Sequence, residues 1–91
     1  MESSLPVLVD MWAPWCMPCK MVAPAVEKIA KDNSDKLKVC KLNVDDNQNI
    51  AVNHNIQGIP ALLIFKDGKE VDRIVGAVSP QAIQSKLDSI L

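Results

Sequence analysis

Two cysteines with the spacing of a redox pair stand near the start of the chain. They lie in the segment Trp12-Ala13-Pro14-Trp15-Cys16-Met17-Pro18-Cys19-Lys20. An apolar run precedes this segment and an amphipathic run follows it, and a Cys-x-x-Cys at such a strand-to-helix junction is typical of a dithiol site. The start of a helix offers unpaired N–H groups and partial positive charge, which stabilise a thiolate at Cys16. Cys19 lies about one helical turn further on, so that the two sulfurs can meet.

The position of Cys16 ahead of the helix predicts that it is the nucleophile and is partly exposed, as a reactive cysteine must be. Its thiolate would attack a partner's disulfide, and Cys19, which is expected to be more buried, would then resolve the mixed disulfide. The alternatives are a structural cysteine pair and half of a zinc site completed by Cys40 and His54. Zinc is disfavoured because these residues fall on separate elements. Cys40 by itself is interpreted as a small buried hydrophobe on a strand.

Two charged residues in apolar surroundings are further candidates. Asp10 lies inside an apolar strand, and burial raises the pKa of a carboxylate, which suits a proton acceptor near neutral pH. The alternative is an aspartate that caps the following loop. Lys41 is expected in a central strand, where it could pair with Asp10 and tune it; the alternative is a solvated lysine at a sheet edge.

Composition limits the class of protein. The 91 residues predict one domain, residues 1–91, and 48% apolar with 23% charged residues is ordinary for a globular chain. A net charge of −1 gives no sign of a nucleic-acid or membrane partner. No apolar run approaches the roughly 18 residues of a spanning helix, and residues 1–4 are too short and polar for a signal peptide. Three cysteines do not form a secreted disulfide framework, so we expect a reducing compartment.

The elements that must position these residues follow from hydrophobic periodicity. Strands are expected at Leu5–Met11, Leu37–Val44, Ala61–Phe65 and Glu70–Val75, and helices at Met17–Asn33, at Asn47–His54 and from Ser79-Pro80 onward. Pro24 predicts a kink in the first helix. Asp67-Gly68 predicts a type I′ hairpin turn. The order β-α-β-α-β-β-α indicates an α/β fold with one four-stranded mixed sheet and helices on both faces. Its first two strands would be parallel, with a right-handed crossover.

Several separated motifs match one known family in order and spacing. They are Val9-Asp10-Met11-Trp12-Ala13, Trp15-Cys16-Met17-Pro18-Cys19-Lys20, Pro24, Lys41-Leu42-Asn43-Val44-Asp45, Gly58-Ile59-Pro60 and Val75-Gly76-Ala77. Through them the chain resembles the thioredoxins from about Leu5 to Leu91, which implies the thioredoxin fold. Met17 departs from the glycine usual there, and the family's usual first strand and helix are missing. Met17 could change the redox potential of the cysteine pair and the set of partner proteins. The missing strand and helix could lower the stability of the fold and leave an edge of the sheet uncovered.

The resemblance implies a protein-disulfide reductase that uses the Cys16–Cys19 dithiol and its redox-active disulfide. No bound cofactor is expected, because the dithiol is the redox centre. The partners implied are disulfide-containing proteins and a thioredoxin reductase fed by NADPH or ferredoxin. In this family an aspartate at the position of Asp10 deprotonates the second cysteine through a water, and Lys41 is expected to assist it. The expected location is the cytoplasm, or the plastid stroma after removal of a transit peptide.

The resemblance also implies a substrate surface. The Ile59-Pro60 bond would be cis, with Pro60 beside the cysteines and the Ile59 backbone open to an extended substrate segment. A shallow apolar groove would be formed by Trp15, Ile59, Val75, Gly76 and Ala77. Trp12 would pack beneath the site. The substrate-binding residues expected in all are Trp15, Met17, Pro18, Ile59, Pro60, Val75, Gly76 and Ala77.

Two further hypotheses remain open at this stage. Thioredoxin-like domains also serve as docking modules whose cysteines are dispensable, and insulin reduction separates that function from an enzyme's. Separately, without the usual first strand, Leu37–Val44 becomes a sheet edge that Lys38 and Lys41 protect only in part. We therefore expect weak self-association through this strand, with a disulfide between two Cys40 residues under oxidation.

Overall fold

The computed structural model describes residues 5–76 and 78–91 of the chain. The predicted element order is confirmed within these residues. The elements are β1 (Val7–Trp12), α1 (Met17–Asp32), β2 (Lys38–Asn43), α2 (Gln48–Asn53), β3 (Ala61–Lys66), β4 (Lys69–Val75) and α3 (Pro80–Asp88). Their ends differ from the predicted ends by a residue or two, as element ends commonly do. The signal-peptide prediction for residues 1–4 and the substrate contact predicted for Ala77 lie outside the described residues.

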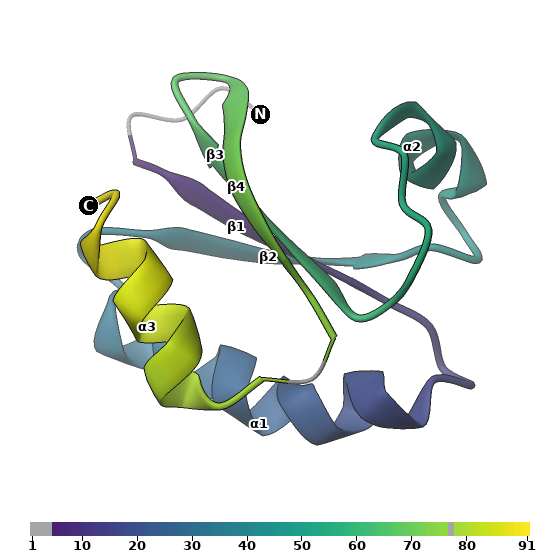
Figure 1. The fold of residues 1–91 in the computed structure, drawn as a ribbon, viewed down its shortest axis with the longest axis horizontal. Coiled ribbons are helices and arrows are strands. Elements are labelled where there is room, and N and C mark those ends of the chain that lie inside the picture. Colours follow the sequence, from purple (N-terminus) through teal and green to yellow (C-terminus); the bar gives the residue numbers. More distant parts are fainter. Residues whose placement is uncertain (1–4, 77) are drawn as a thin grey trace.

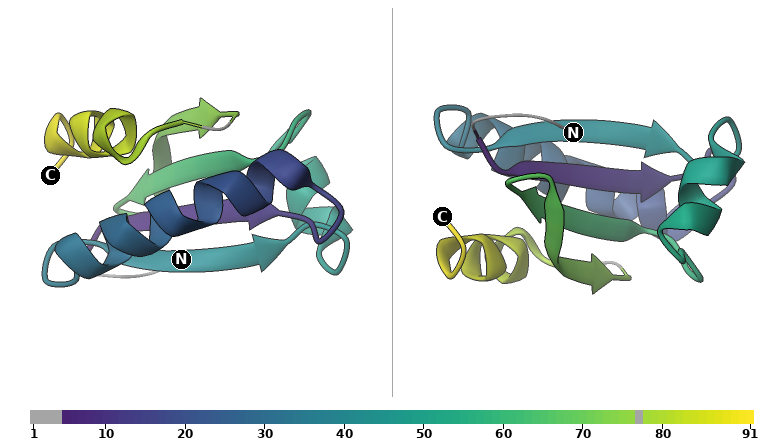
Figure 2. Two further views of the ribbon diagram at one scale, coloured as in Figure 1. Left: turned by 90° about the horizontal axis from the view of Figure 1, so that it is seen from below. Right: turned by 90° about the horizontal axis from the view of Figure 1, so that it is seen from above.

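The four strands form one mixed sheet in the order β2-β1-β3-β4. β1 and β2 are parallel because α1 carries the chain back across the sheet before β2 begins (Figure 1). β3 is antiparallel to both β1 and β4. The predicted mixed sheet is confirmed, but β2 lies at the border of the sheet rather than at its centre (Figure 2). The prediction that Lys41 stands in a central strand is therefore wrong, and the expectation that the strand of Leu37–Val44 is a sheet edge is confirmed among the described residues.

Side chains that alternate along the strands build a hydrophobic core on each face of the sheet. The first core lies under α1 and α3 and includes Leu8, Val22, Val26, Ile29, Leu62, Ile64, Ile83 and Leu87. The second contains Val7, Val9, Met11, Ala61, Leu63 and Phe65, with partly buried residues from β2 and α2 against it. Figure 1 shows α1 and α3 together on one side and α2 on the other. Helices on both faces are confirmed, although α2 has only six residues and buries none of them.

The helix that carries the cysteines begins and ends as its sequence indicates. Cys16 is its N-cap, Pro18 falls in its first turn, where a missing N–H costs little, and the Asn33 N–H donates to the Ile29 carbonyl at its end. Val22, Ala25, Val26 and Ile29 form the apolar stripe that it buries. α1 continues through Pro24 as one helix of 16 residues, and the kink predicted there stays a prediction.

The turn between β3 and β4 has the conformation that its sequence predicts. Asp67 has φ 55° and Gly68 has φ 79°, both in the left-handed region required by a type I′ turn. This turn allows β3 and β4 to pair from Lys66 with Lys69 up to Ala61 with Val75. This pairing brings the end of β4 at Val75 beside the residues that precede β3.

Candidate active site around Cys16 and Cys19

Cys16 and Cys19 are joined by a disulfide at the start of α1. Their Cα atoms are 5.2 Å apart, inside the normal disulfide range, because three residues of a first helical turn bring the side chains together. The backbone N–H of Cys19 donates to the Cys16 sulfur at 3.1 Å. The helix start thus directs an N–H group and its positive partial charge at the sulfur of Cys16, as expected for a site that stabilises a thiolate.

Both cysteines are buried in this disulfide form. Cys16 is 4% exposed and Cys19 is 2% exposed, so the prediction that Cys16 is partly exposed is wrong here. The two residues form a small cluster with Ala13, against which Trp12 and Ile59 pack. The closed disulfide lies within this apolar cluster. Trp12 packs against the cysteines, as the sequence predicts.

Asp10 is buried on β1, with 2% of its surface exposed. Burial raises its pKa from 3.8 to about 6, and the charge of Lys41 lowers it by a smaller amount. The Oδ1 atom has no hydrogen-bond partner among the described residues. A buried carboxylate in this state titrates close to neutral pH, as a proton acceptor should.

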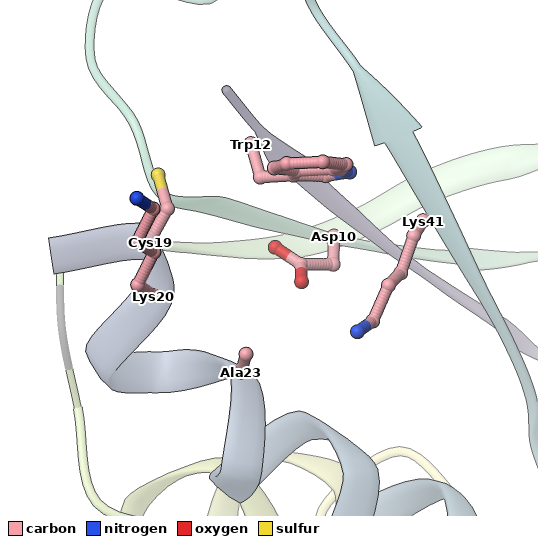
Figure 3. A pocket seen from close by; sticks show the side chains of 6 residues that line it. All are labelled: Asp10, Trp12, Cys19, Lys20, Ala23 and Lys41. Atoms are coloured by element: carbon pink, nitrogen blue, oxygen red, sulfur yellow. The ribbon is translucent and has the colours of Figure 1, made fainter. Parts of the chain in front are cut away.

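A cavity of about 130 Å³ joins Asp10 to the cysteine site. Its lining residues are Asp10, Trp12, Cys19, Lys20, Ala23 and Lys41. Figure 3 shows the Asp10 carboxylate in the middle of this pocket, with α1 on one side and Lys41 on the other. The space is large enough for water, which needs only about 10–15 Å³ of such volume. The geometry therefore allows proton transfer between Cys19 and Asp10 through a bridging water.

Lys41 lies opposite Asp10 on the neighbouring strand, but its ion pair is with another residue. Its Nζ is 3.6 Å from Glu27 Oε1 on α1, and the lysine side chain is 43% exposed. The expected direct pair with Asp10 is thus replaced by an electrostatic influence across the cavity. The sequence missed Glu27 because its position opposite Lys41 depends on how α1 crosses the sheet.

The Ile59-Pro60 peptide bond is cis, which confirms the expectation from the resemblance. Pro60 is buried, while Ile59 is half-buried and packs against the cysteine cluster. The Gly76 N–H donates to the Pro60 carbonyl at 2.9 Å, so the end of β4 is held against this turn. Val75 beside it is 60% exposed.

An open cavity of about 380 Å³ lies beside Trp15 and Ile59. It is lined by Trp15, Val44, Ala51, Ile56, Gln57, Gly58 and Ile59. Trp15 and Ile59 of the predicted groove line this cavity, and the rest of that groove, Val75, Gly76 and Ala77, stays a prediction. The sequence missed its far wall because the placement of α2 and the loop after it depends on tertiary packing.

Trp15 is held over the site by a contact that the sequence analysis did not identify. Its indole N–H donates to Asp45 Oδ2 at 2.9 Å, and 67% of the residue remains exposed. Asp45 is the last residue of the family motif Lys41–Asp45, and its place in that motif was the sign in the sequence that it has a role near the site. Met17 is 64% exposed and Pro18 is also exposed, both in the first turn of α1 beside the disulfide.

Cys40 and His54, the two residues considered as further zinc ligands, lie on β2 and at the end of α2. Cys40 is half-buried on β2 and free, so it is less enclosed than predicted, because β2 is a border strand. His54 caps the end of α2 and contacts the Phe65 ring edge-on.

Residues 5–76 and 78–91 contain no group of three or more acidic, cysteine or histidine side chains that could hold a metal ion. In the same part of the chain, no helix has the length and apolar character needed to cross a membrane.

Comparison with known proteins matches the amino-acid sequence to one family. The family model described as Thioredoxin matches residues 1–89. Thioredoxin 1 of Synechococcus elongatus is 54% identical over the whole chain, which covers 85% of that protein. The thioredoxin of Synechocystis is 52% identical with the same coverage, and the chloroplastic M-type thioredoxin of Chlamydomonas reinhardtii is 47% identical, with 65% of its length covered. The chain therefore belongs to the thioredoxin family and is a thiol–disulfide oxidoreductase with a Cys-x-x-Cys motif.

Proposed function

We propose that this protein reduces disulfides in partner proteins by passing two electrons from the Cys16–Cys19 dithiol. The observation that carries the proposal is the cavity in which a buried carboxylate, Asp10, meets Cys19 beside the disulfide. A structural disulfide needs no such group. Family membership supports the same conclusion, because thioredoxins act on disulfide substrates and are themselves reduced by thioredoxin reductase.

In the first step, the thiolate of Cys16 attacks one sulfur of the partner's disulfide. A bond forms between that sulfur and the sulfur of Cys16, the partner's disulfide bond breaks, and the released partner thiolate takes up a proton. The start of α1 favours the thiolate of Cys16, since the Cys19 N–H already points at that sulfur. The product of this step is a mixed disulfide.

In the second step, Cys19 resolves the mixed disulfide. Asp10 accepts the proton of the Cys19 thiol through water in the shared cavity, and the new thiolate attacks the sulfur of Cys16. The Cys16–Cys19 disulfide closes, the bond between Cys16 and the partner breaks, and the second partner sulfur leaves as a thiolate that takes up a proton from water. Lys41 acts as a positioning residue whose charge moderates the pKa of Asp10.

The partner segment is expected to lie along the surface beside the disulfide. The exposed residues Trp15, Met17 and Pro18 offer contacts on one side, and the Ile59-Pro60 turn with Val75 and Gly76 offers them on the other. The cavity of about 380 Å³ beside Trp15 and Ile59 is large enough to accept an apolar side chain of the partner. An extended segment could pair with the Ile59 backbone as an added strand.

Thioredoxin reductase is the proposed electron donor, fed by NADPH or ferredoxin. The proposed location is the cytoplasm, or the plastid stroma if a transit peptide is removed. Relatives with chloroplastic names support the second location and cyanobacterial relatives the first. We also propose that residues 1–91 act as one domain.

Reduction of insulin by dithiothreitol in the presence of the protein tests the proposal directly. The wild type is expected to accelerate the reaction, and Cys16→Ser is expected to abolish the acceleration because the attacking sulfur is lost. Cys19→Ser should still attack but should accumulate partner proteins joined to Cys16. Cys40→Ser is the matched control, since it removes the one cysteine outside the motif. Normal turnover by Cys16→Ser would refute the proposal, and partners joined to Cys19 in that variant would reverse the two roles.

A further inference from the structure

The far wall of the cavity beside Trp15 and Ile59 comes from a segment that buries little of its own surface. Ala51 of α2 and residues 56–58 of the loop after it form this wall. α2 has six residues and buries none of them, and it lies on the side of the sheet opposite α1 and α3 (Figure 1). The shape of the cavity therefore depends on contacts that tie this segment to the sheet.

The chain leaves α2 through a turn that backbone hydrogen bonds close. The Asn55 N–H donates to the Val52 carbonyl at 3.0 Å, and the Ile56 N–H donates to the Ala51 carbonyl at 2.9 Å. Asn55 has φ 56°, the left-handed conformation that this Schellman type of helix end requires. The His54 carbonyl is one of the last carbonyls of α2, which need a partner from outside the helix.

Arg73 of β4 supplies the partner of that carbonyl. Its Nη2 atom donates to the His54 carbonyl oxygen at 3.0 Å. Arg73 pairs with Leu63 of β3, whose side chain belongs to the second core, so the arginine lies on the face of the sheet that α2 covers. The hydrogen bond therefore ties the end of α2 to a strand of the sheet.

Glu70 holds the guanidinium of Arg73 in position. Both Nε and Nη2 of the arginine donate to the Glu70 carboxylate, Nη2 to Oε1 at 2.7 Å. This hydrogen bonding lowers the pKa of Glu70 below its usual value, so the carboxylate is charged at neutral pH. Because Nη2 carries two N–H groups, one can serve Glu70 while the other serves His54. Such a two-point pair fixes direction as well as distance.

A β-bulge explains why Glu70 and Arg73 share a face of the sheet. Residues three apart in a regular strand point to opposite faces. The register between β3 and β4 shifts at this point, and Val71 is an extra residue between the paired residues Glu70 and Asp72. The bulge turns Glu70 to the face of Arg73, whereas Asp72 points to the other face and pairs with Lys86 of α3.

We propose that Arg73 is a positioning residue for partner binding, because its fork between Glu70 and His54 holds the wall of the cavity that receives a side chain of the disulfide partner. This role rests on the proposed function, since the cavity lies on the surface at which the partner would bind. The start of the same segment is held by the hydrogen bond from Trp15 to Asp45. The wall is thus fixed at both ends, once to the cysteine loop and once to β4.

A wall held in this way affects large partners and not small disulfides. A protein partner places a side chain in the cavity beside Trp15, whereas a disulfide of a few atoms needs access only to Cys16. Arg73 lines neither this cavity nor the one that contains Asp10. Its effect on binding therefore passes through the position of the wall.

Hydrogen exchange of the protein with its disulfide closed tests the contact itself. Arg73→Met keeps an aliphatic stem and removes the donors, so the amides of Asn55 and Ile56 should exchange roughly 2- to 10-fold faster. Lys86→Met is the matched control, because it breaks the ion pair between α3 and Asp72 of the same strand. In this control, the two amides should exchange as they do in the wild type.

Oxidation of the reduced protein by two disulfides tests the effect on partners. Each reaction closes the Cys16–Cys19 disulfide and converts the partner's disulfide into thiols, and the fluorescence of Trp12, which packs against the cysteines, follows it. Arg73→Met should raise the half-saturating concentration of insulin roughly 2- to 10-fold and leave the limiting rate unchanged. Its rate with hydroxyethyl disulfide should match the wild type, as should both reactions of Lys86→Met.

Arg73→Lys decides the proposal if Arg73→Met fails to fold. Its ammonium keeps the charge but lacks the fork geometry that serves Glu70 and His54 together, so both effects should appear in weaker form. Folded variants that equal Lys86→Met in exchange and in insulin binding would overturn the proposal. So would faster exchange with unchanged insulin binding, or an equal loss with hydroxyethyl disulfide. A wild type that reduces neither disulfide would refute the proposed function, and with it the role of the wall.

Discussion

At the scale of single residues, the proposed chemistry depends on one buried carboxylate beside the cysteine pair. Asp10 is buried, its pKa is raised to about 6, and it shares a cavity with Cys19. Burial supplies the larger effect, and the positive charge of Lys41 opposes it. The pKa of Asp10 is therefore set by its depth in the sheet and moderated by a neighbouring strand.

Asp10→Asn should slow release of the mixed disulfide far more than its formation. The amide cannot accept the proton of Cys19, and a positioned base typically contributes at least about 100-fold to such a step. Rapid-mixing experiments with a disulfide peptide separate the two steps. Asp72→Asn is the control, because that carboxylate pairs with Lys86 on α3 and is absent from the cavity. Equal slowing of both steps would mean that Asp10 only supports the fold.

Met17→Gly should change the redox potential modestly and leave activity intact. Met17 carries no charge and so has little electrostatic effect on the thiolate of Cys16. Glycine loses more conformational entropy when the disulfide closes, which should favour the reduced form. Equilibration with glutathione buffers measures the potential. Met21→Gly is a useful comparison, since Met21 is similarly exposed on α1 but lies outside the motif. Identical potentials for Met17→Gly and wild type would show that the departure from the family pattern is neutral.

At the scale of elements, the site depends on how strand ends are brought together. β1 ends just before the cysteines, and the hairpin of β3 and β4 carries Gly76 to the Pro60 carbonyl. The hairpin turn lies at the opposite end of β3 and β4 from the site, and it fixes how the two strands pair. A substitution at Asp67 or Gly68, which both have positive φ, should therefore lower the stability of the hairpin.

Gly68→Ala should lower the free energy of unfolding by about 1–2 kcal/mol, the cost of a side chain in the left-handed region. Apart from its own residue and its two chain neighbours, a Cβ atom at Gly68 would meet no atom within 4 Å, so the cost arises from the local backbone conformation and not from packing. Gly58→Ala is the matched control, because its Cβ would make only an ordinary contact, 3.7 Å from Val75 Cγ1. Urea denaturation measures both variants. Equal effects of the two substitutions would contradict this account of the turn.

At the scale of the whole molecule, the buried charge of Asp10 opposes folding. Its pKa is 3.8 in the unfolded reference and about 6 in the folded state, so between these values the folded protein binds more protons. Stability from this group is therefore fully present below pH 3.8 and is lost as the pH rises through about 6. The lowered pKa values of Glu70 and Asp72 act in the opposite direction, because their contributions are lost as the pH falls.

The difference in stability between Asp10→Asn and wild type isolates this effect, because Glu70 and Asp72 are present in both proteins. The variant should match the wild type below pH 3.8 and exceed it above pH 6. A pKa shift of about two units corresponds to a gain of about 3 kcal/mol at most. Urea denaturation from pH 3 to 8 gives the measurement. A difference that does not change with pH would show that Asp10 is not the titrating group.

The sequence alone predicted what short-range chemistry determines. Helix capping and the Cys-x-x-Cys spacing placed the disulfide at the start of α1, and Asp67-Gly68 determined the hairpin turn because few residues accept positive φ. Apolar alternation identified the strands, and the matched motifs identified the family. These features depend on neighbours along the chain, which the sequence shows directly.

Only the tertiary structure decided which distant residues meet. It paired Lys41 with Glu27 instead of Asp10, gave Trp15 its partner Asp45, and buried Cys16. It also formed the cavity beside Trp15 and Ile59, whose other wall comes from α2 and the loop after it. Each of these outcomes depends on how α1 crosses the sheet, on where α2 packs or on the order of the strands. Those are properties of the packed core, so no local pattern in the sequence could supply them.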